Sequence, residues 1–247
     1  MSSAKKIRQP SGVNALRALE LLVDHQQGLG IAAMGRELGM DGAQCHRLVN
    51  GLKSAGYVSK TAASPSRYVV TPKVLRLAAK LLANSELIQV SQPIMVRLRD
   101  EVGETVHLAA MFYGVAISVA RQLSRQHVGV ITHIGESWTV NEGAVGLVAG
   151  AFGPNSDEVD GDLRRRHVQI LERGFAHDQE EVMRGVVGFA APIFDLANQL
   201  VGALAIAGPS ERVTGEHKNG AHLGGKITEA AAEVSSQLGW LGDGYSA

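Results

Sequence analysis

Apolar side chains recur three or four positions apart through the first 54 residues, which is the spacing of one face of a helix. The pattern predicts three helices in succession. The first begins at Ser11, which can cap it, and ends before Gly28. The second, Ile31–Leu38, is ended by Gly39, and the third starts after Asp41. Two short helices joined by so brief a turn predict a helix-turn-helix.

The third helix has distinct inward and outward faces. Asp41 and Gln44 form a capping-box arrangement, in which each side chain can bind a free backbone N–H at the start of the helix. The inward positions are Cys45, Leu48, Val49 and Leu52. The outward positions are Gly42, Ala43, Gln44, His46, Arg47, Asn50 and Lys53.

The outward face carries side chains that suit DNA. Small residues let the helix approach the floor of the major groove, Gln and Asn pair with adenine, and Arg pairs with guanine or phosphate. The alternative is an ordinary solvated helix face. A β-hairpin predicted directly afterwards, with strands at 56–58 and Tyr68–Val70, favours DNA because it matches the wing of a winged helix-turn-helix. Lys60 and Arg67 on this wing are expected to contact the DNA backbone.

The remaining pattern predicts a second domain. A helix at 74–83 is too apolar for a solvated linker, so we expect it to pack against the first domain or a second protomer. Beyond it the pattern predicts helices at 86–102 (interrupted near Pro93), 141–152, 163–173 and 214–238, and strands at 105–113, 115–122, 127–133, 186–194 and 200–207. Antiparallel strands covered by helices indicate an α+β sensory domain.

The charge is distributed unevenly although the net charge is zero. Of the 24 basic and 24 acidic residues, residues 1–84 hold 12 and four. A basic first module on an acidic body is typical of a protein in which one module meets phosphate. The basic segment 1–10 is followed by no apolar signal region, and no apolar run is long enough to span a membrane, so we expect a cytoplasmic protein.

Other chemistry has little support in the sequence. The single cysteine, Cys45, excludes an internal disulfide and falls on an inward helix face. Nine histidines occur without an HExxH motif, so surface or hydrogen-bonded roles are expected rather than a metal site. Asp178 lies near Glu180 and Glu181, but no matching nucleophile or phosphate loop accompanies them. We therefore expect no catalytic residues, no metal and no cofactor.

Several motifs together resemble the IclR family of bacterial transcriptional regulators. They are VNALRAL at 13–19, RL at 47–48, GYV at 56–58 and EVGETVHL at 101–108. The most specific stretch, 174–209, combines Asp178, Glu180-Glu181, Gly185, Ala190-Ala191-Pro192, Asp195 and Gly208-Pro209 at the family's spacing. The resemblance covers nearly the whole chain.

The resemblance implies a domain order and a mode of action. A basic arm at 1–10, a winged helix-turn-helix at 11–71 and a linker helix at 72–85 would precede a GAF-like effector-binding domain at 86–247. Family members act as dimers or dimers of dimers. Paired recognition helices would then meet two half-sites of double-stranded operator DNA about one helical turn apart.

The resemblance also implies an effector pocket. Its candidate residues are Gly143, Ala144, Val145, Gly146, Asp178, Val186, Gly188, Ala205 and Ala207, and Trp138 just before them is the first aromatic to mutate. Relatives often carry serines where this chain has Ala205 and Ala207, and a cysteine at Gly188. Loss of these polar groups favours a larger, partly apolar or aromatic effector, with backbone N–H groups at 141–144 holding any carboxylate.

The sequence therefore predicts a ligand-responsive regulator of a catabolic or metabolic operon. The effector would be a small organic or aromatic acid, or a derivative, and the regulator would act as repressor or activator. To change DNA binding, the effector must bind unequally to the two states of the protein that differ in DNA affinity. The alternative from another class is a metabolite-binding or hydrolytic protein with a vestigial DNA-binding domain.

Overall fold

The computed structural model describes residues 10–62, 65–154, 156, 159–213 and 220–242. The chain forms two compact units, Met1–Leu81 and Leu82–Ala247. The expected arm at 1–9 and the expected helix start at 214 lie outside the described residues.

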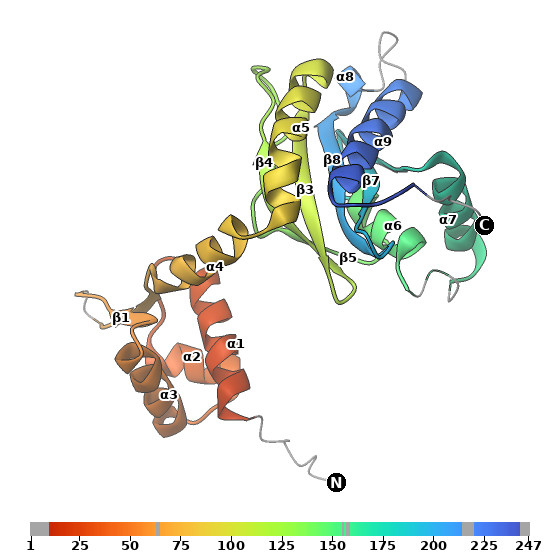
Figure 1. Ribbon diagram of the computed structural model, residues 1–247. Helices are drawn as coiled ribbons and strands as arrows, with labels where there is room; N and C mark the ends of the chain where they lie inside the picture. Colours follow the sequence, from red (N-terminus) through yellow and green to blue (C-terminus); the bar gives the residue numbers. More distant parts are fainter. Residues whose placement is uncertain (1–9, 63–64, 155, 157–158, 214–219, 243–247) are drawn as a thin grey trace. The chain divides into compact units, whose positions relative to one another are not determined.

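The first unit is a helical domain with a small hairpin (Figure 1). Its elements are α1 (Ser11–Asp24), α2 (Ile31–Leu38), α3 (Gly42–Ser54), β1 (Val58–Lys60), β2 (Tyr68–Val70) and α4 (Lys73–Ala83), the last of which runs into the second unit. β1 and β2 pair antiparallel, and Leu29 adds an isolated bridge to Tyr68. The core contains Ala18, Leu22, Met34, Leu38, Cys45, Val49, Leu52, Val58 and Tyr68. This is the predicted winged helix-turn-helix.

Of the two helix caps that the sequence predicted, one is confirmed and the other is wrong. The Asp41 carboxylate accepts a hydrogen bond from the Gln44 backbone N–H at 2.7 Å, as the sequence predicted. Ser11, by contrast, is the first residue of α1 and not its cap. Pro10 occupies the cap position and has no side-chain oxygen, so α1 begins without a side-chain cap.

The second unit is built on a six-stranded antiparallel sheet in the order β5-β4-β3-β8-β7-β6. Its elements are α5 (Glu86–Val102), β3 (Thr105–Phe112), β4 (Val115–Gln122), β5 (Ser137–Thr139), α6 (Gly143–Phe152), α7 (Gly161–Arg173), β6 (Ala176–Gln179), β7 (Val186–Phe194), β8 (Leu200–Pro209), α8 (Ser210–Val213) and α9 (Gly220–Gln237). Helices α5 and α9 lie on one face, and α6 lies on the other (Figure 1). The expected α+β class is confirmed.

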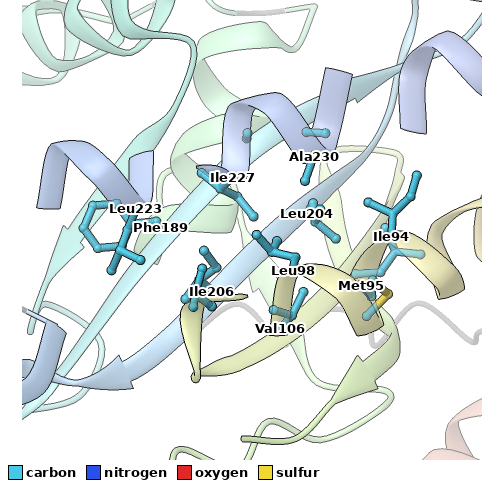
Figure 2. Close-up of a cluster of buried hydrophobic side chains, with 14 of the residues drawn as sticks. Ile94, Met95, Leu98, Val106, Phe189, Leu204, Ile206, Leu223, Ile227 and Ala230 are labelled. Atoms are coloured by element: carbon cyan, nitrogen blue, oxygen red, sulfur yellow. The ribbon is translucent and has the colours of Figure 1, made fainter. Parts of the chain in front are cut away.

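Side-chain size differs between the two faces of the sheet. Large apolar residues of the strands pack against α5 and α9, where Leu98, Ile227, Leu204 and Ile206 meet (Figure 2). On the opposite face the strands contribute mainly alanine, including Ala203 and Ala205 of β8. Because side chains alternate along a strand, one sequence supplies both surfaces. Because the side chains on this second face, called the small face below, are short, α6 lies close to the sheet.

The expected strand at 127–133 is wrong. Val128 and Ile131 are more than half exposed, and this stretch is a loop. Side chains hold it: the Thr105 hydroxyl donates to the Val130 carbonyl at 2.6 Å, and Arg121 donates to the carbonyl of Thr132. The edge strands are instead β5 and β6, which are three and four residues long and too short for a clear alternating pattern.

The predicted interruption of the helix near Pro93 is also wrong. Helix α5 continues through it from Glu86 to Val102, starting with the Ser85 hydroxyl, which accepts from the Ile88 N–H at 3.4 Å. Proline lacks one N–H donor, but burial of Ile94, Met95 and Leu98 against the sheet holds the helix together.

A buried ion pair ties α8 to the start of β3. The Glu104 side chain is fully buried, and its two oxygens accept from Arg212 Nε and Nη2 at 2.5 and 2.7 Å. Arg212 Nη2 also donates to the Val128 carbonyl at 2.9 Å. This bidentate arrangement compensates the desolvated carboxylate.

Arg212→Met should lower the free energy of unfolding by about 3 kcal/mol, because it leaves a buried carboxylate without its partner. Arg97→Met is the matched control, since it breaks the Arg97–Glu233 pair, in which both side chains are substantially exposed. That change should cost less than about 1 kcal/mol. Urea unfolding followed by circular dichroism measures both, and equal losses in the two variants would contradict the prediction.

Candidate DNA-binding and effector-binding sites

Helix α3 presents its outward residues much as the pattern predicted. Gly42, Ala43, His46, Arg47, Asn50 and Lys53 are exposed, and Gln44 is half-buried. Cys45 and Val49 are fully buried, and burial raises the pKa of the Cys45 thiol. The Asp41 cap fixes the first turn, where small side chains leave the backbone accessible. The surface can therefore enter a groove and offer amide, imidazole and guanidinium donors.

The outward residues form two groups on the helix. Asn50 Nδ2 and His46 Nδ1 lie 3.1 Å apart, so these side chains orient one another. Gln44 and Arg47 instead line a hollow of about 1130 Å³ that is also bordered by α1 and the end of α2. Arg17 and Arg36 border the same hollow. Gln44 thus lies on the flank of α3 toward α1, which explains its partial burial.

The wing residues lie beside α3, and one of them has a second role. Lys60 and Arg67 are both exposed, but Arg67 Nη1 also donates to the Gly28 carbonyl at 3.2 Å. Lys73, which the sequence did not single out, donates to the Ala55 carbonyl at 2.6 Å and lies over the Tyr57 ring. The Arg67 bond fastens the wing to the segment between α1 and α2, and the Lys73 bond fastens the start of α4 to the end of α3.

The candidate effector residues come together on the small face of the sheet. Register places Asp178 of β6 beside Gly188 of β7, which is beside Ala207 of β8. The next row on this face contains Ala176, Ala190, Ala205 and His107. Val186 shares the face but lies at the end of β7, where it is paired with Pro209.

Helix α6 covers this face at close range. A Cβ on Gly188 would lie 3.5 Å from the Ala144 Cβ. A Cβ on Gly143 would lie 3.5 Å from Asp178 Oδ2 and 3.9 Å from Trp138 Cδ1. The start of α6, Asp178, Gly188 and Trp138 therefore meet at one place. Val145 and Gly146 are also buried, within the following turn of the helix.

The Asp178 carboxylate has one oxygen engaged by the neighbouring loop. Oδ1 accepts from the Glu181 backbone N–H at 2.8 Å, and Oδ2 is the oxygen near Gly143. Burial raises the pKa of Asp178, and hydrogen bonds from backbone N–H groups of the neighbouring loop offset only part of this rise. Oδ2 lies beside the start of α6.

His107 of β3 lies beside Trp138 but was not among the predicted site residues. It is 4% exposed, and neither ring nitrogen has a hydrogen-bond partner among the described residues. Its ring stacks on Trp138 with centroids 5.3 Å apart, and burial lowers its pKa to about 4. The expectation of surface or hydrogen-bonded histidines is wrong here, although it holds for His167, which pairs with Asn141 Oδ1 at 2.7 Å. The available signal was a lone polar residue between Val106 and Leu108 in an apolar strand.

Among the described residues, no group of three or more His, Cys, Asp or Glu side chains is placed to hold a metal ion. In the same part of the chain, no helix is both long and apolar enough to cross a membrane.

Comparison with known sequences assigns both units. The family model described as IclR helix-turn-helix domain matches residues 13–62. The model described as Bacterial transcriptional regulator IclR C-terminal matches residues 79–166 and 158–236. Together they match residues 13–62 and 79–236, and the C-terminal model alone covers more than half of the chain.

Individual relatives agree with the family models. The glycerol operon regulatory protein of Streptomyces coelicolor is 27% identical over 241 residues, covering 91% of this chain and 94% of its own. The HTH-type transcriptional regulator KdgR of Escherichia coli is 25% identical over 262 residues, covering 97% and 98%.

Solved structures share the fold. A regulator from Silicibacter sp. TM1040 aligns with a TM-score of 0.77 at 24% identity, covering 93% of this chain and 96% of its own. The Thermotoga maritima IclR aligns with a TM-score of 0.68 at 20% identity, covering 93% and 99%. The winged helix-turn-helix, the effector domain and these matches lead to one conclusion: this chain belongs to the IclR family of bacterial transcriptional regulators.

Proposed function

We propose that α3 inserts into the major groove of operator DNA and reads it with Arg47 and Asn50. The observation that carries this is the exposed polar face of α3, held by the Asp41 cap in a basic unit. Gly42 and Ala43 allow the close approach. The remaining contacts are assigned to Gln44, His46, Lys53, Lys60 and Arg67, with the two wing residues on the DNA backbone.

The assembly that fits this reading is a homodimer. Helix α4 carries exposed leucines, with Leu75 at 70%, Leu77 at 51% and Leu81 at 76% exposure. An apolar surface of this kind on a single helix is suited to a second copy of the chain. Two α3 helices could then meet paired half-sites, and two dimers could pair into a tetramer. Because operator DNA is bacterial chromosomal DNA, we place the protein in the cytoplasm, as a regulator and not an enzyme.

The proposed effector site lies in the domain at 86–247, beyond the DNA-binding domain at 11–71 and the linker at 72–85. Its floor is the small face of the sheet, to which Gly188, Ala205 and Ala207 contribute. Asp178 and Trp138 border it beside the start of α6, which contributes Gly143, Ala144, Val145 and Gly146. Such a surface suits a partly apolar or aromatic metabolite better than a small oxo-acid.

Arg47→Ala should weaken binding to the DNA upstream of the protein's own gene by about 1 to 3 kcal/mol, since a base-edge contact has that value. The matched control is Arg164→Ala, which removes the same charge from an exposed position of α7. Gel-shift titrations at two salt concentrations measure both. Unchanged affinity in Arg47→Ala would reject the helix assignment. Weak binding by the unmodified protein, without salt-sensitive specificity, would favour a vestigial DNA-binding domain.

The effector class can be tested separately by calorimetry. Aromatic acids should bind the protein more tightly than glyoxylate or pyruvate, because the alanine floor offers apolar contact and few hydroxyl groups. Gly188→Ser is a useful companion, since it narrows the approach to Ala144 and adds a hydroxyl. Tight binding of pyruvate or glyoxylate with no binding of aromatic acids would contradict this proposal.

A further inference from the structure

We infer that His107 binds a hydroxyl or carbonyl group of the effector and thereby determines which effectors are recognised. This inference rests on the proposed effector site, because it concerns the same face of the sheet. It adds a residue that lies on β3, outside the segments so far assigned to the site.

The imidazole of His107 is buried without hydrogen-bond partners in the part of the chain that the structure describes. His107 is almost completely buried, yet both ring nitrogens lack a hydrogen-bond partner among the described residues. Burying a polar group without a partner is costly, and native proteins rarely do so without a reason. Ser118 Oγ is also buried and, within the described chain, equally unpartnered. It belongs to β4 and is paired with Ala109, two residues along β3 from His107 on the same face.

A strip of small residues leads across the sheet from His107 to Asp178. His107 pairs with Ala205, which pairs with Ala190, and the neighbouring row runs from Ala207 through Gly188 to Asp178. Strands β3 and β6 are three spacings apart, so this strip is about 14 Å long at the backbone. Alanine and glycine line this strip, a polar group lies at each end, and α6 packs over it, so an effector would have to enter between α6 and the sheet.

The His107 ring stacks on the Trp138 ring. The two ring planes are inclined by only 24°, which fixes the orientation of the imidazole. The same indole lies near Gly143 at the start of α6. A ligand group that meets His107 therefore adjoins the aromatic residue already assigned to the site. His107, Trp138 and the start of α6 form a continuous border.

The chemistry of the group follows from the state of the imidazole. With its pKa near 4, His107 is neutral at pH 7 and offers one N–H donor and one acceptor nitrogen. Arg121 is paired with His107 across β3 and β4, and its side chain donates to the Thr132 carbonyl. A neutral imidazole pairs well with a hydroxyl or carbonyl and poorly with a carboxylate that needs a cation.

The test is His107→Phe in the full-length protein. Phenylalanine keeps the volume and the stacking on Trp138 but removes both nitrogens. The probes are three matched pairs: 4-hydroxy- and 4-methylbenzamide, 4-hydroxy- and 4-methylbenzoate, and 4-hydroxy- and 4-methylbenzyl alcohol. At least one hydroxyl compound should bind the unmodified protein in calorimetry and bind His107→Phe at least tenfold more weakly. Its methyl counterpart should change less than threefold.

His133→Phe is the matched control, because it makes the same replacement at an exposed loop position of the same unit. It should leave both members of each pair unchanged. The inference is overturned if no hydroxyl compound binds the unmodified protein, or if His107→Phe weakens the hydroxyl and methyl compounds equally.

Stability gives a second readout that needs no ligand. His107→Phe should raise the melting temperature, since it removes an unpaired buried polar group. The unmodified protein should also lose stability relative to the variant between pH 6.5 and 4, because its unfolded state takes up a proton there and its folded state does not. A lower melting temperature would instead indicate a purely structural histidine and contradict the inference. Operator binding without ligand should be equal in both proteins, and its absence from both would count against the proposed function alone.

Discussion

The structure of the second unit depends on the difference in side-chain size between the two faces of one sheet. Leu204 and Ile206 of β8 fill the interface with α5 and α9, while Ala203 and Ala205 between them face α6. The large residues supply most of the buried apolar area, which is the main favourable term in folding. The alanines supply little apolar area, and their small side chains let α6 pack close to the face on which we place the effector site.

This division separates stability from recognition. Residues on the α5 and α9 face form a densely packed core, where a change of one methylene is felt. On the α6 face, the polar groups of Asp178, His107 and Ser118 are buried at positions where a purely structural core would place apolar residues. Natural sequences break packing rules mainly at functional sites, which is why we assign these three positions to the proposed effector site.

Regulation requires that the effector site and the DNA-binding unit share a two-state element. Helix α4 is the connection along the chain, and its exposed leucines suit a surface between two copies. An effector with unequal affinity for two arrangements of such a dimer would change the spacing of the paired α3 helices. Fixed half-site spacing on DNA would then convert that change into a difference in affinity.

Local patterns in the sequence predicted most of the secondary structure. The faces of α3, the Asp41 cap and the long strands β3, β4, β7 and β8 follow from periodicity and capping, which act over a few residues. The same patterns misjudged 127–133, because an apolar run becomes a strand only if a neighbouring strand can pair with it. They also missed β5 and β6, whose form depends on the strands beside them.

The sequence by itself determined the family, the winged helix-turn-helix and the α+β class, since these rest on local spacing and on motifs that can be read in order. Through resemblance it also predicted an effector site at Asp178, Gly188 and the start of α6. Only the tertiary structure places His107 on the same face of the sheet. Its burial, its unpaired nitrogens and its stacking on Trp138 arise from strands far apart in the chain, and strand register alone brings those residues together.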